Sequence, residues 1–463
     1  MAKKLFTVTD LGGGDGGKGG VVHKICTEMN AHTVIKVGGA QGSHGVATSR
    51  GFKFNFSQFG CGTFEGVKTH LTQNFVIDPN GIMNEAELLK YGCGVRNSFE
   101  YLTVDENAIS ATPWHQAASR LRELARRDNP RGTIGTGVGE AFLDAERYPK
   151  LAIRAKDIKG NNLYRQLEAV RMQKIAELAE ITANNDCFLE SDRDSATELI
   201  ELLHFPGLIQ WTYDRFKTMA SSVRIVESDY LEKEVLERDG VVVVESSHGV
   251  LTDRYYGFHP HTSKLRTIPA ETTFNLLKEC GYDGEVIKLG VTRAYQIRHG
   301  AGPMVTECSE MLENLLPGSN KNENRWQGKV RVGPLDFVAL RYAVNVCGGP
   351  DAFDGIAVTW FDQIIVNGAW KMCDSYNGAH HQHFFEKGDI LVRRGADEHQ
   401  LAHQGKLGEL LRMCRPNCTA YLFRKNEKLE YMIELCERVF TQELKVPVKM
   451  ISFGPTEDDK ICL

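Results

Sequence analysis

The fold is decided by Leu5-Phe6-Thr7-Val8, a short apolar run, and by the turn Gly12-Gly13-Gly14-Asp15-Gly16-Gly17-Lys18-Gly19-Gly20 that follows it. The apolar run is typical of a strand buried on both faces, and apolar residues at three- and four-residue spacing predict a helix over 20–29. A glycine-rich turn before a helix exposes backbone amides that favour phosphate. The stretch therefore predicts an α/β fold with a P-loop-like phosphate loop after the first strand.

Similar runs recur along the chain and alternate with amphipathic stretches, which predicts a largely parallel central sheet flanked by helices. No linker or repeat divides the sequence, so we expect residues 1–463 to form a single elaborated domain. The expected strands are Leu5–Val8, Thr33–Val37, Val241–Val244, Val286–Leu289, Ile356–Thr359 and Val448–Ser452, and the expected helices are Gly20–Met29, Ala117–Arg127, Leu163–Ala183 and Lys428–Leu444.

Composition narrows the class of partner. The chain has 463 residues, of which 42% are hydrophobic and 25% charged, and this usage is that of a globular protein. Its formal net charge of -5, without a long basic run, argues against binding to nucleic acid or an anionic membrane but leaves small anionic ligands possible. Twelve scattered cysteines and the lack of an apolar signal segment predict reduced thiols in a cytoplasmic protein.

Asp15 is the unusual member of the first loop. The segment from Gly12 to Lys18 satisfies the GxxxxGK part of a P-loop, but Gly19 stands where Ser or Thr would ligate magnesium. A carboxylate among phosphate-binding amides repels the phosphate unless it binds a metal ion or accepts a proton from the substrate. The alternative is a glycine-rich turn with a helix-capping aspartate.

A second glycine-rich loop, Gly38-Gly39-Ala40-Gln41-Gly42-Ser43-His44-Gly45, follows the second expected strand. Because ligands bind beyond the carboxyl ends of parallel strands, this loop should lie beside the first one. A lone loop histidine is usually a surface residue. Beside a phosphate loop, however, His44 is a candidate proton donor or electrostatic stabiliser at a phosphate oxygen.

These stretches and several later ones resemble the adenylosuccinate synthetase family, and the matches keep their order across essentially the whole chain. Gly14 to Gly19 is similar to the family's Gly-Asp-Glu-Gly-Lys-Gly, and Gly38 to Gly45 to its Gly-Gly-His-Asn-Ala-Gly-His-Thr. The other matching stretches are Ile134-Gly135-Thr136-Gly137-Val138-Gly139-Glu140, Arg298-His299-Gly300-Ala301-Gly302-Pro303-Met304-Val305-Thr306-Glu307, Thr359-Trp360-Phe361-Asp362 and Ser452-Phe453-Gly454-Pro455.

The resemblance implies a ligase. In the family, GTP phosphorylates the 6-oxygen of IMP, and the amine of aspartate then displaces that phosphate to give adenylosuccinate. Asp15 would be the base at N1 of the purine and, with Ser43, a ligand of Mg²⁺, while His44 would assist at the phosphates of GTP. ATP remains open as the energy donor.

The resemblance also assigns binding residues. Trp360 stands where the family has lysine, so it would either stack on a purine face or pack in the core. The implied substrate-nucleotide residues are Gly14, Gly17, Lys18, Gln41, Thr136, His248 and Ser263, and the implied GTP residues are Ser43, Gly45, Trp360, Asp362, Ser452 and Gly454.

The amino-acid loop departs most from the family pattern. Arg298, Arg325, Lys329 and Arg331 would bind the amino acid, but the family's threonines are absent, so an amine donor other than aspartate stays open. A homodimer is expected because family members receive an arginine from the neighbouring subunit. Arg147 and Lys150 are the candidates for that role here.

The sequence and its resemblance to the family leave three alternative functions for this protein. The first is ligation of aspartate to IMP, and the second is the same chemistry on GMP or dGMP, where Gly16 replaces a glutamate of the family and would loosen the loop or enlarge its pocket. The third is a catalytically silent regulator that binds purine nucleotides, since the amino-acid loop is rebuilt.

Overall fold

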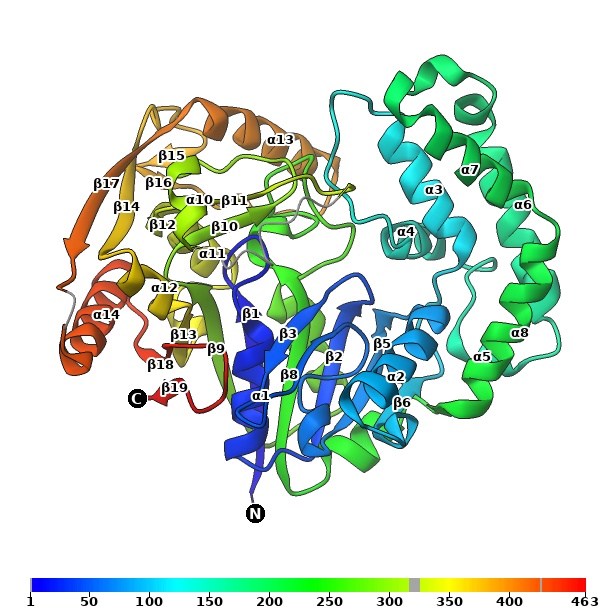
Figure 1. The fold of residues 1–463 in the computed structure, drawn as a ribbon, viewed down its shortest axis with the longest axis horizontal. Coiled ribbons are helices and arrows are strands. Elements are labelled where there is room, and N and C mark those ends of the chain that lie inside the picture. Colours follow the sequence, from blue (N-terminus) through cyan, green and yellow to red (C-terminus); the bar gives the residue numbers. More distant parts are fainter. Residues whose placement is uncertain (1, 316–324, 425–426) are drawn as a thin grey trace.

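The protein is described by a computed structural model that covers residues 2–315, 325–424 and 427–463. Within these residues, a ten-stranded sheet crosses the centre of the molecule (Figure 1). Neighbouring strands pair in parallel along the whole sheet except at one edge, where the last pair is antiparallel. In spatial order the strands are β19 (Lys460–Cys462), β18 (Val448–Ser452), β13 (Gly355–Thr359), β9 (Glu285–Arg293), β1 (Lys3–Asp10), β8 (Gly240–Gly249), β2 (Thr33–Gly39), β5 (Lys68–Val76), β6 (Leu102–Asp105) and β7 (Arg224–Val226).

This sheet confirms the α/β class and every expected strand. Sequence patterns alone do not predict β5, β6, β7 and β19. In β5 the buried positions include Thr69, His70 and Thr72, so the strand lacks a continuous apolar run although it lies inside the sheet. The other three strands have three or four residues each, which is too short for a periodic signal.

The expected helices are confirmed as α1 (Lys18–Glu28), α3 (Pro113–Leu124), α6 (Leu163–Thr182) and α14 (Leu429–Leu444). Helix α3 begins earlier than the expected Ala117 because Thr112 caps it: the hydroxyl of Thr112 accepts from the amide of His115, and Pro113 occupies the first turn. The remaining α-helices are α2 (Pro79–Cys93), α4 (Val138–Arg147), α5 (Ala155–Lys159), α7 (Arg193–His204), α8 (Gly207–Ser222), α9 (Asn275–Glu279), α10 (Ser309–Leu315), α11 (Phe337–Val346), α12 (Phe361–Val366) and α13 (Glu398–Met413).

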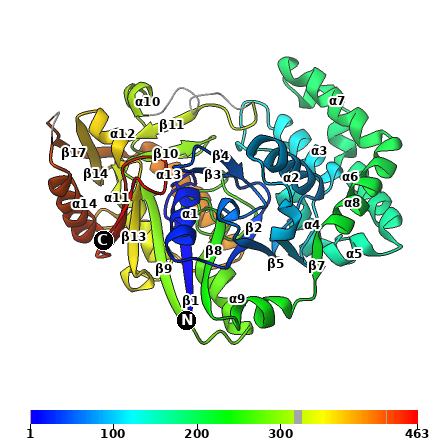
Figure 2. The ribbon, with the colours of Figure 1, turned by 60° about the horizontal axis from the view of Figure 1, so that its bottom comes forward.

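Two lobes flank the central sheet. Helices α3 to α8 gather beyond the edge formed by β5, β6 and β7, and the turned view places them on the same side (Figures 1 and 2). The opposite lobe contains α10 to α14 and a small sheet. The smaller sheets comprise β12 (Leu335–Asp336), β14 (Ala369–Asn377) and β17 (Arg415–Leu422), then β10 (Gln296–His299) with β11 (Val330–Gly333), β3 (His44–Ala47) with β4 (Lys53–Phe56), and β15 (Phe385–Glu386) with β16 (Asp389–Ile390).

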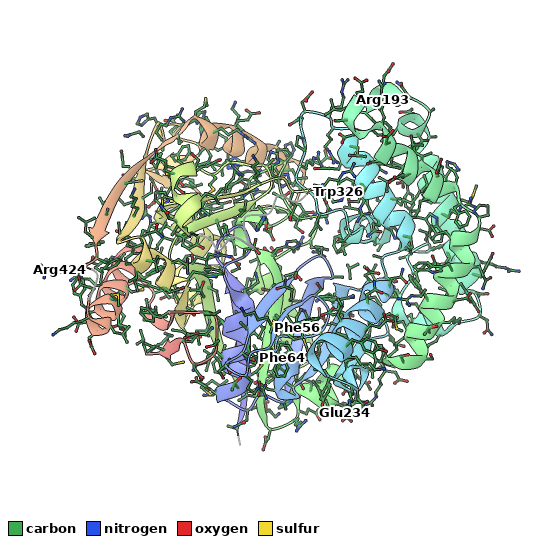
Figure 3. All side chains as sticks on the ribbon, viewed as in Figure 1. Phe56, Phe64, Arg193, Glu234, Trp326 and Arg424 are labelled. Carbon is green, nitrogen blue, oxygen red and sulfur yellow. The ribbon has the colours of Figure 1, made fainter. Side chains whose placement is uncertain are left out.

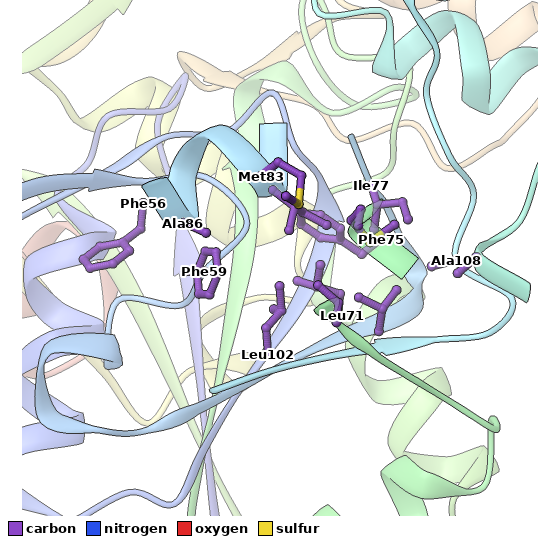
Figure 4. Close-up of a cluster of buried hydrophobic side chains, with 14 of the residues drawn as sticks. Phe56, Phe59, Leu71, Phe75, Ile77, Met83, Ala86, Leu102 and Ala108 are labelled. Carbon is purple, nitrogen blue, oxygen red and sulfur yellow. The ribbon is translucent and has the colours of Figure 1, made fainter. Parts of the chain in front are cut away.

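A hydrophobic core anchors the strands that carry the loops. Figure 4 shows Met83 of α2 beside Phe75 of β5, and Ala86 of α2 beside Phe59, and these side chains are buried. A second core cluster fills the opposite lobe, around Phe337 and Trp370. Burial on both sides fixes the sheet, so the loops after its strands start from rigid positions.

None of the helices in the described parts of the chain combines the length and the apolar character that crossing a membrane requires. All twelve cysteines are free thiols.

Candidate active site

A cleft of about 350 Å³ lies at the carboxyl ends of β1, β2 and β8, between the two lobes. Trp326, which belongs to a segment leading to this cleft, appears between the lobes in Figure 3. The arrangement agrees with the rule that ligands of parallel sheets bind beyond the strand ends. The sequence-predicted residues that line the cleft are Gly14, Asp15, Lys18, Gln41, Ser43, His44, Thr136, His248, Ser263 and Arg298.

The phosphate loop is built around the buried carboxylate of Asp10. Asp10 accepts hydrogen bonds from the amides of Gly12 and Gly16, both at 2.8 Å, and from the ammonium of Lys18 at 3.0 Å. A Cβ on Gly16 would lie 2.7 Å from Asp10 Oδ2. The carboxylate of Asp10 therefore fills the space beside Gly16, while the expectation that Gly16 loosens the loop or enlarges its pocket stays a prediction.

Asp15 does not cap the following helix. Gly17 is the N-cap residue of α1, and no side chain caps it, so the capping alternative is wrong. Asp15 has a left-handed backbone with φ of 59°, and its side chain is 43% exposed in the cleft. Arg293 Nε donates to the carbonyl oxygen of Asp15 at 2.5 Å, and His299 Nε2 lies 3.2 Å from its Oδ2. Asp15 is thus held at the cleft by two other segments: Arg293 contacts its backbone, and His299 contacts its carboxylate.

His44 is oriented by a buried carboxylate. Its Nδ1 lies 2.6 Å from Glu245 Oε1, and the same oxygen accepts from Lys36 Nζ at 2.9 Å. Burial alone would raise the pKa of Glu245, but Lys36 and His44 hold it well below its usual range. Burial lowers the pKa of His44, against the effect of Glu245. The carboxylate therefore fixes Nδ1 as the protonated nitrogen and leaves Nε2 for a ligand in the cleft.

His44, Cys61 and Glu245 are close enough to share a metal ion. However, the ammonium of Lys36 already contacts Glu245, and burial raises the pKa of the Cys61 thiol well above its usual range. A protonated thiol beside an ammonium does not suit a metal ion. The group is an ion-pair network that supports His44.

The far wall of the cleft holds Thr136 and Ser263, next to the N-terminus of α4. Gln41 and His248 hydrogen-bond each other across the floor. Burial and the nearby Lys18 lower the pKa of His248 to about 4, so the ring is neutral at pH 7. These four side chains present neutral hydrogen-bonding groups, as a phosphate or ribose site requires.

The predicted GTP residues of β13 and β18 lie outside this cleft, at the carboxyl ends of strands on the other side of β1. The half-buried ring of Trp360 packs against the core, and the guanidinium of Arg293 lies 4.3 Å from its centroid. Burial raises the pKa of Asp362. The hydroxyl of Ser452 is buried and has no hydrogen-bond partner among the described residues. A Cβ on Gly454 would lie 2.6 Å from Cγ of Asp459, so a larger residue does not fit there without a shift.

The predicted amino-acid residues do not converge. Arg298 is buried and lines the cleft, whereas Arg331 binds Glu307 at 2.7 Å and also donates to the carbonyl of Gly300 at 2.7 Å. Arg325 hydrogen-bonds Ser195 on α7, and Lys329 is exposed. Gly17 and Gly45 also lie outside the cleft lining.

Sequence reasoning missed several residues of this site. Glu245 lies within β8, directly after the apolar run Val241–Val244, and that position was a usable signal. His299 and Lys264 line the cleft from segments distant in sequence, and nothing in their local patterns indicates this. The candidates for a subunit-crossing cation, Arg147 and Lys150, do not line the cleft of their own chain.

A parallel sheet with a phosphate loop after its first strand and a polar cleft at the strand ends defines a nucleotide-binding α/β protein. The family model of adenylosuccinate synthetase matches residues 8–461. The chain therefore belongs to the adenylosuccinate synthetase family, whose members are carbon–nitrogen ligases.

Individual relatives agree with this assignment. The chain is 26% identical to the adenylosuccinate synthetase of Clostridium beijerinckii over 379 residues, covering 80% of this chain and 81% of that protein. It is 26% identical to that of Chlorobium chlorochromatii over 454 residues, covering 97% and 95%.

Solved structures share the fold. Fully ligated adenylosuccinate synthetase from Plasmodium falciparum superposes with a TM-score of 0.75 at 17% identity, covering 99% of both chains. The succinoaminodeoxyadenylate synthetase PurZ of cyanophage S-2L, bound to dGMP and dATP as an energy donor, gives a TM-score of 0.59 at 14% identity, covering 100% of this chain and 96% of that one.

Proposed function

We propose that the protein joins aspartate to C6 of a 6-oxo purine nucleotide, with IMP as the first candidate, and that GTP drives the reaction through a 6-phosphoryl intermediate. The observation that carries this proposal is the meeting of Asp15, the phosphate loop and His44 in one cleft. Membership of the family supports the same chemistry.

The chemistry needs a base and an activated leaving group. A lactam oxygen is a poor nucleophile and leaves poorly, so removal of the N1 proton and phosphorylation of O6 address the two difficulties in turn. Asp15 is the proposed base because its carboxylate is exposed in the cleft yet anchored by His299. His44 would donate to phosphate from Nε2, since Glu245 holds its other nitrogen.

Mg²⁺ is the proposed cofactor. Asp15 and Ser43 both present side-chain oxygens to the cleft, and oxygen donors together with phosphate suit this ion. When bound, Mg²⁺ would neutralise charge on the phosphoryl group. Asp15 and Ser43 are the residues that would hold it.

We assign the substrate nucleotide to the cleft and the base of GTP to the ends of β13 and β18. The buried, unpaired hydroxyl of Ser452 supports the second site, because a buried polar group without a partner costs stability unless a ligand binds it. Asp362 would accept from guanine, and ATP remains the alternative donor. The substrate residues are Gly14, Gly17, Lys18, Gln41, Thr136, His248 and Ser263, and the GTP residues are Ser43, Gly45, Trp360, Asp362, Ser452 and Gly454.

Arg298 is the proposed main anchor for the carboxylates of the amino acid, since it is buried at the cleft without an acidic partner among the described residues. Arg325, Lys329 and Arg331 would have to reorganise to join it. A homodimer is proposed as the assembly, with Arg147 or Lys150 entering the partner's cleft. Arg147 ends α4, whose first turn lies at its own cleft, so a 10-residue helix of about 15 Å carries it away from that site.

The test is turnover of a nucleotide panel. The protein with Mg²⁺, GTP or ATP, and aspartate is incubated with IMP, GMP or dGMP, and the succinylated product and free phosphate are quantified by chromatography. Product from IMP supports the proposal, whereas product from GMP or dGMP alone moves the assignment to a 2-amino purine. Nucleotide binding without turnover for every amine tested would replace the ligase with a nucleotide-binding regulator.

A further inference from the structure

Two cysteines face each other across a strand pair in the lobe that contains α10 to α14. Strands β14 and β17 run antiparallel and lie side by side in both ribbon views, and Cys373 of β14 is in register with Cys418 of β17 (Figures 1 and 2). Directly opposed residues of an antiparallel pair point to the same face of the sheet, with Cβ atoms roughly 4.5–5.5 Å apart. A disulfide needs a Cβ separation of about 3.5–4.5 Å, so a small closing movement of the two strands allows one to form.

The side chains of the two cysteines interact in the reduced protein. Burial raises the pKa of the Cys418 thiol, and a hydrogen bond with the side chain of Cys373 opposes that rise. The thiol of Cys373 also donates to the carbonyl oxygen of Ser375 on its own strand, at 3.2 Å. Cys373 and Cys418 are therefore neighbours through their side chains as well as through their backbones.

The two thiols differ in their access to solvent. β17 is an edge strand of its three-stranded sheet, and Cys418 is exposed there, whereas Cys373 is fully buried. A dissolved oxidant can therefore reach Cys418 but not Cys373. An accessible thiol with a second thiol beside it is the arrangement in which one cysteine attacks an oxidant and the other resolves the product.

The backbone next to Cys373 is irregular. The register of β14 and β17 shifts between Cys373 and Ser375, where β14 carries one residue more than its partner. Such a bulge leaves the extra residue unpaired and disrupts the ladder locally. The closing movement that a disulfide requires therefore meets less resistance at this position than in a regular ladder.

We propose that Cys373 and Cys418 form a redox-modification site that takes a small soluble disulfide, of the glutathione disulfide class, as its oxidant. The thiolate of Cys418 attacks one sulfur of the oxidant, whose S–S bond breaks, and one thiol leaves. The sulfur of Cys373 then attacks the mixed disulfide at Cys418 and displaces the second thiol. Two protein S–H bonds are thus replaced by one cross-strand S–S bond, and the oxidant is reduced to two thiols that take up the two protons.

The bond would hold an edge strand in place. It closes a chain loop that contains α13, whose Arg412 lies 3.0 Å from Nε2 of His261 at the cleft. Closing a long loop restricts the unfolded chain and so stabilises the folded one. Opening of β17 from β14 should therefore be rarer in the oxidised protein. The two cysteines lie outside the cleft lining, so the site does not depend on the proposed function.

The test treats the full-length protein with glutathione disulfide at about pH 8.5, where a larger fraction of each thiol is ionised than at pH 7. Mass spectrometry of peptides prepared without reduction locates the bonds that form. The wild-type protein should show a link between Cys373 and Cys418 that dithiothreitol reverses. Cys373→Ala should stop at a mixed disulfide on Cys418, and Cys418→Ser should leave Cys373 as a free thiol. The control Cys462→Ser, which removes an exposed thiol of β19, should form the link like the wild type.

Hydrogen exchange measures the effect of the bond on the strand. Amide exchange in β17 should slow by roughly 10-fold or more when the wild-type protein is oxidised and should recover on reduction. The same treatment should leave the exchange of β17 unchanged in Cys418→Ser, which folds like the wild type because its substituted side chain is exposed.

Three outcomes overturn the proposal. The first is a wild-type protein in which Cys418 stays unmodified, or carries glutathione while Cys373 remains a thiol. The second is a link from Cys418 to Cys308 or Cys414 in place of Cys373. The third is a link between Cys373 and Cys418 that leaves the hydrogen exchange of β17 unchanged. Failure of the proposed function is seen separately, because a protein that forms the link but turns over no nucleotide keeps this site and loses the ligase.

Discussion

The imidazole Nε2 of His299 lies 3.2 Å from the Oδ2 of Asp15, across the mouth of the cleft. His299 comes from the end of β10 and Asp15 from the loop after β1, so the contact joins segments almost 300 positions apart. It gives the exposed carboxylate a fixed direction. His299 is therefore a positioning residue for Asp15.

Replacing His299 with Ala should lower kcat by roughly 10- to 100-fold, because a misplaced catalytic group loses much of its effect. The KM of the nucleotide should change little, since Thr136 and Ser263, two of the residues proposed to bind it, lie on the far wall of the cleft. His299→Asn should recover part of the rate, as its amide can still donate to the carboxylate. Steady-state kinetics of the three proteins test this, and an unchanged kcat in His299→Ala would remove the contact from the mechanism.

Glu245→Gln should destabilise the protein and reduce activity. The change leaves Lys36 buried without its charge partner, and breaking a buried ion pair costs about 3–5 kcal/mol. Denaturant unfolding at pH 7 measures this cost. Glu245→Asp, which retains the charge, is the control, and a Gln variant as stable as the wild type would show that the network is not needed.

Because of Glu245, the free energy of unfolding should decrease as the pH falls into the acidic range. The pKa of Glu245 in the folded protein lies below its ordinary value of 4.5, so its contribution is present above pH 4.5 and is lost as the pH falls below it. The wild-type protein should therefore lose part of its advantage over Glu245→Gln on acidification from pH 7 to pH 3.5, and more at still lower pH. A constant difference between the two unfolding free energies across that range would contradict the assignment.

Lys264 lines the cleft, so its positive charge should attract an anionic nucleotide. The affinity for nucleotide should therefore fall as the pH rises above about 8. The pKa of Lys264 is lowered to about 8, so the free protein loses this charge there, while Arg131, Arg126 and Arg254 around it remain charged. Lys264→Arg should remove the decline, because arginine keeps its charge. Binding of IMP measured from pH 6.5 to 9.5 tests this, and an identical decline in both proteins would place its cause in another group.

The sequence predicts the parts of this site that are local. The apolar run Leu5–Val8 and the glycines after it determine a strand, a loop and a helix from neighbouring residues alone, and the sheet follows from repeating that pattern. Contacts made by the tertiary fold are different. His299 meets Asp15, and Glu245 meets His44, because the fold brings together segments that are distant in sequence. Local periodicity carries no information about such pairs.

The most direct measurement is the rate of Asp15→Asn, which keeps the size of the side chain but removes both the base and the charge for Mg²⁺. Turnover should fall by roughly two to four orders of magnitude, the range usual for a positioned general base. Binding of nucleotide without magnesium should stay unchanged or become tighter, because a negative charge near the phosphates is gone. A variant that keeps more than about a tenth of the wild-type rate would contradict the central role of Asp15.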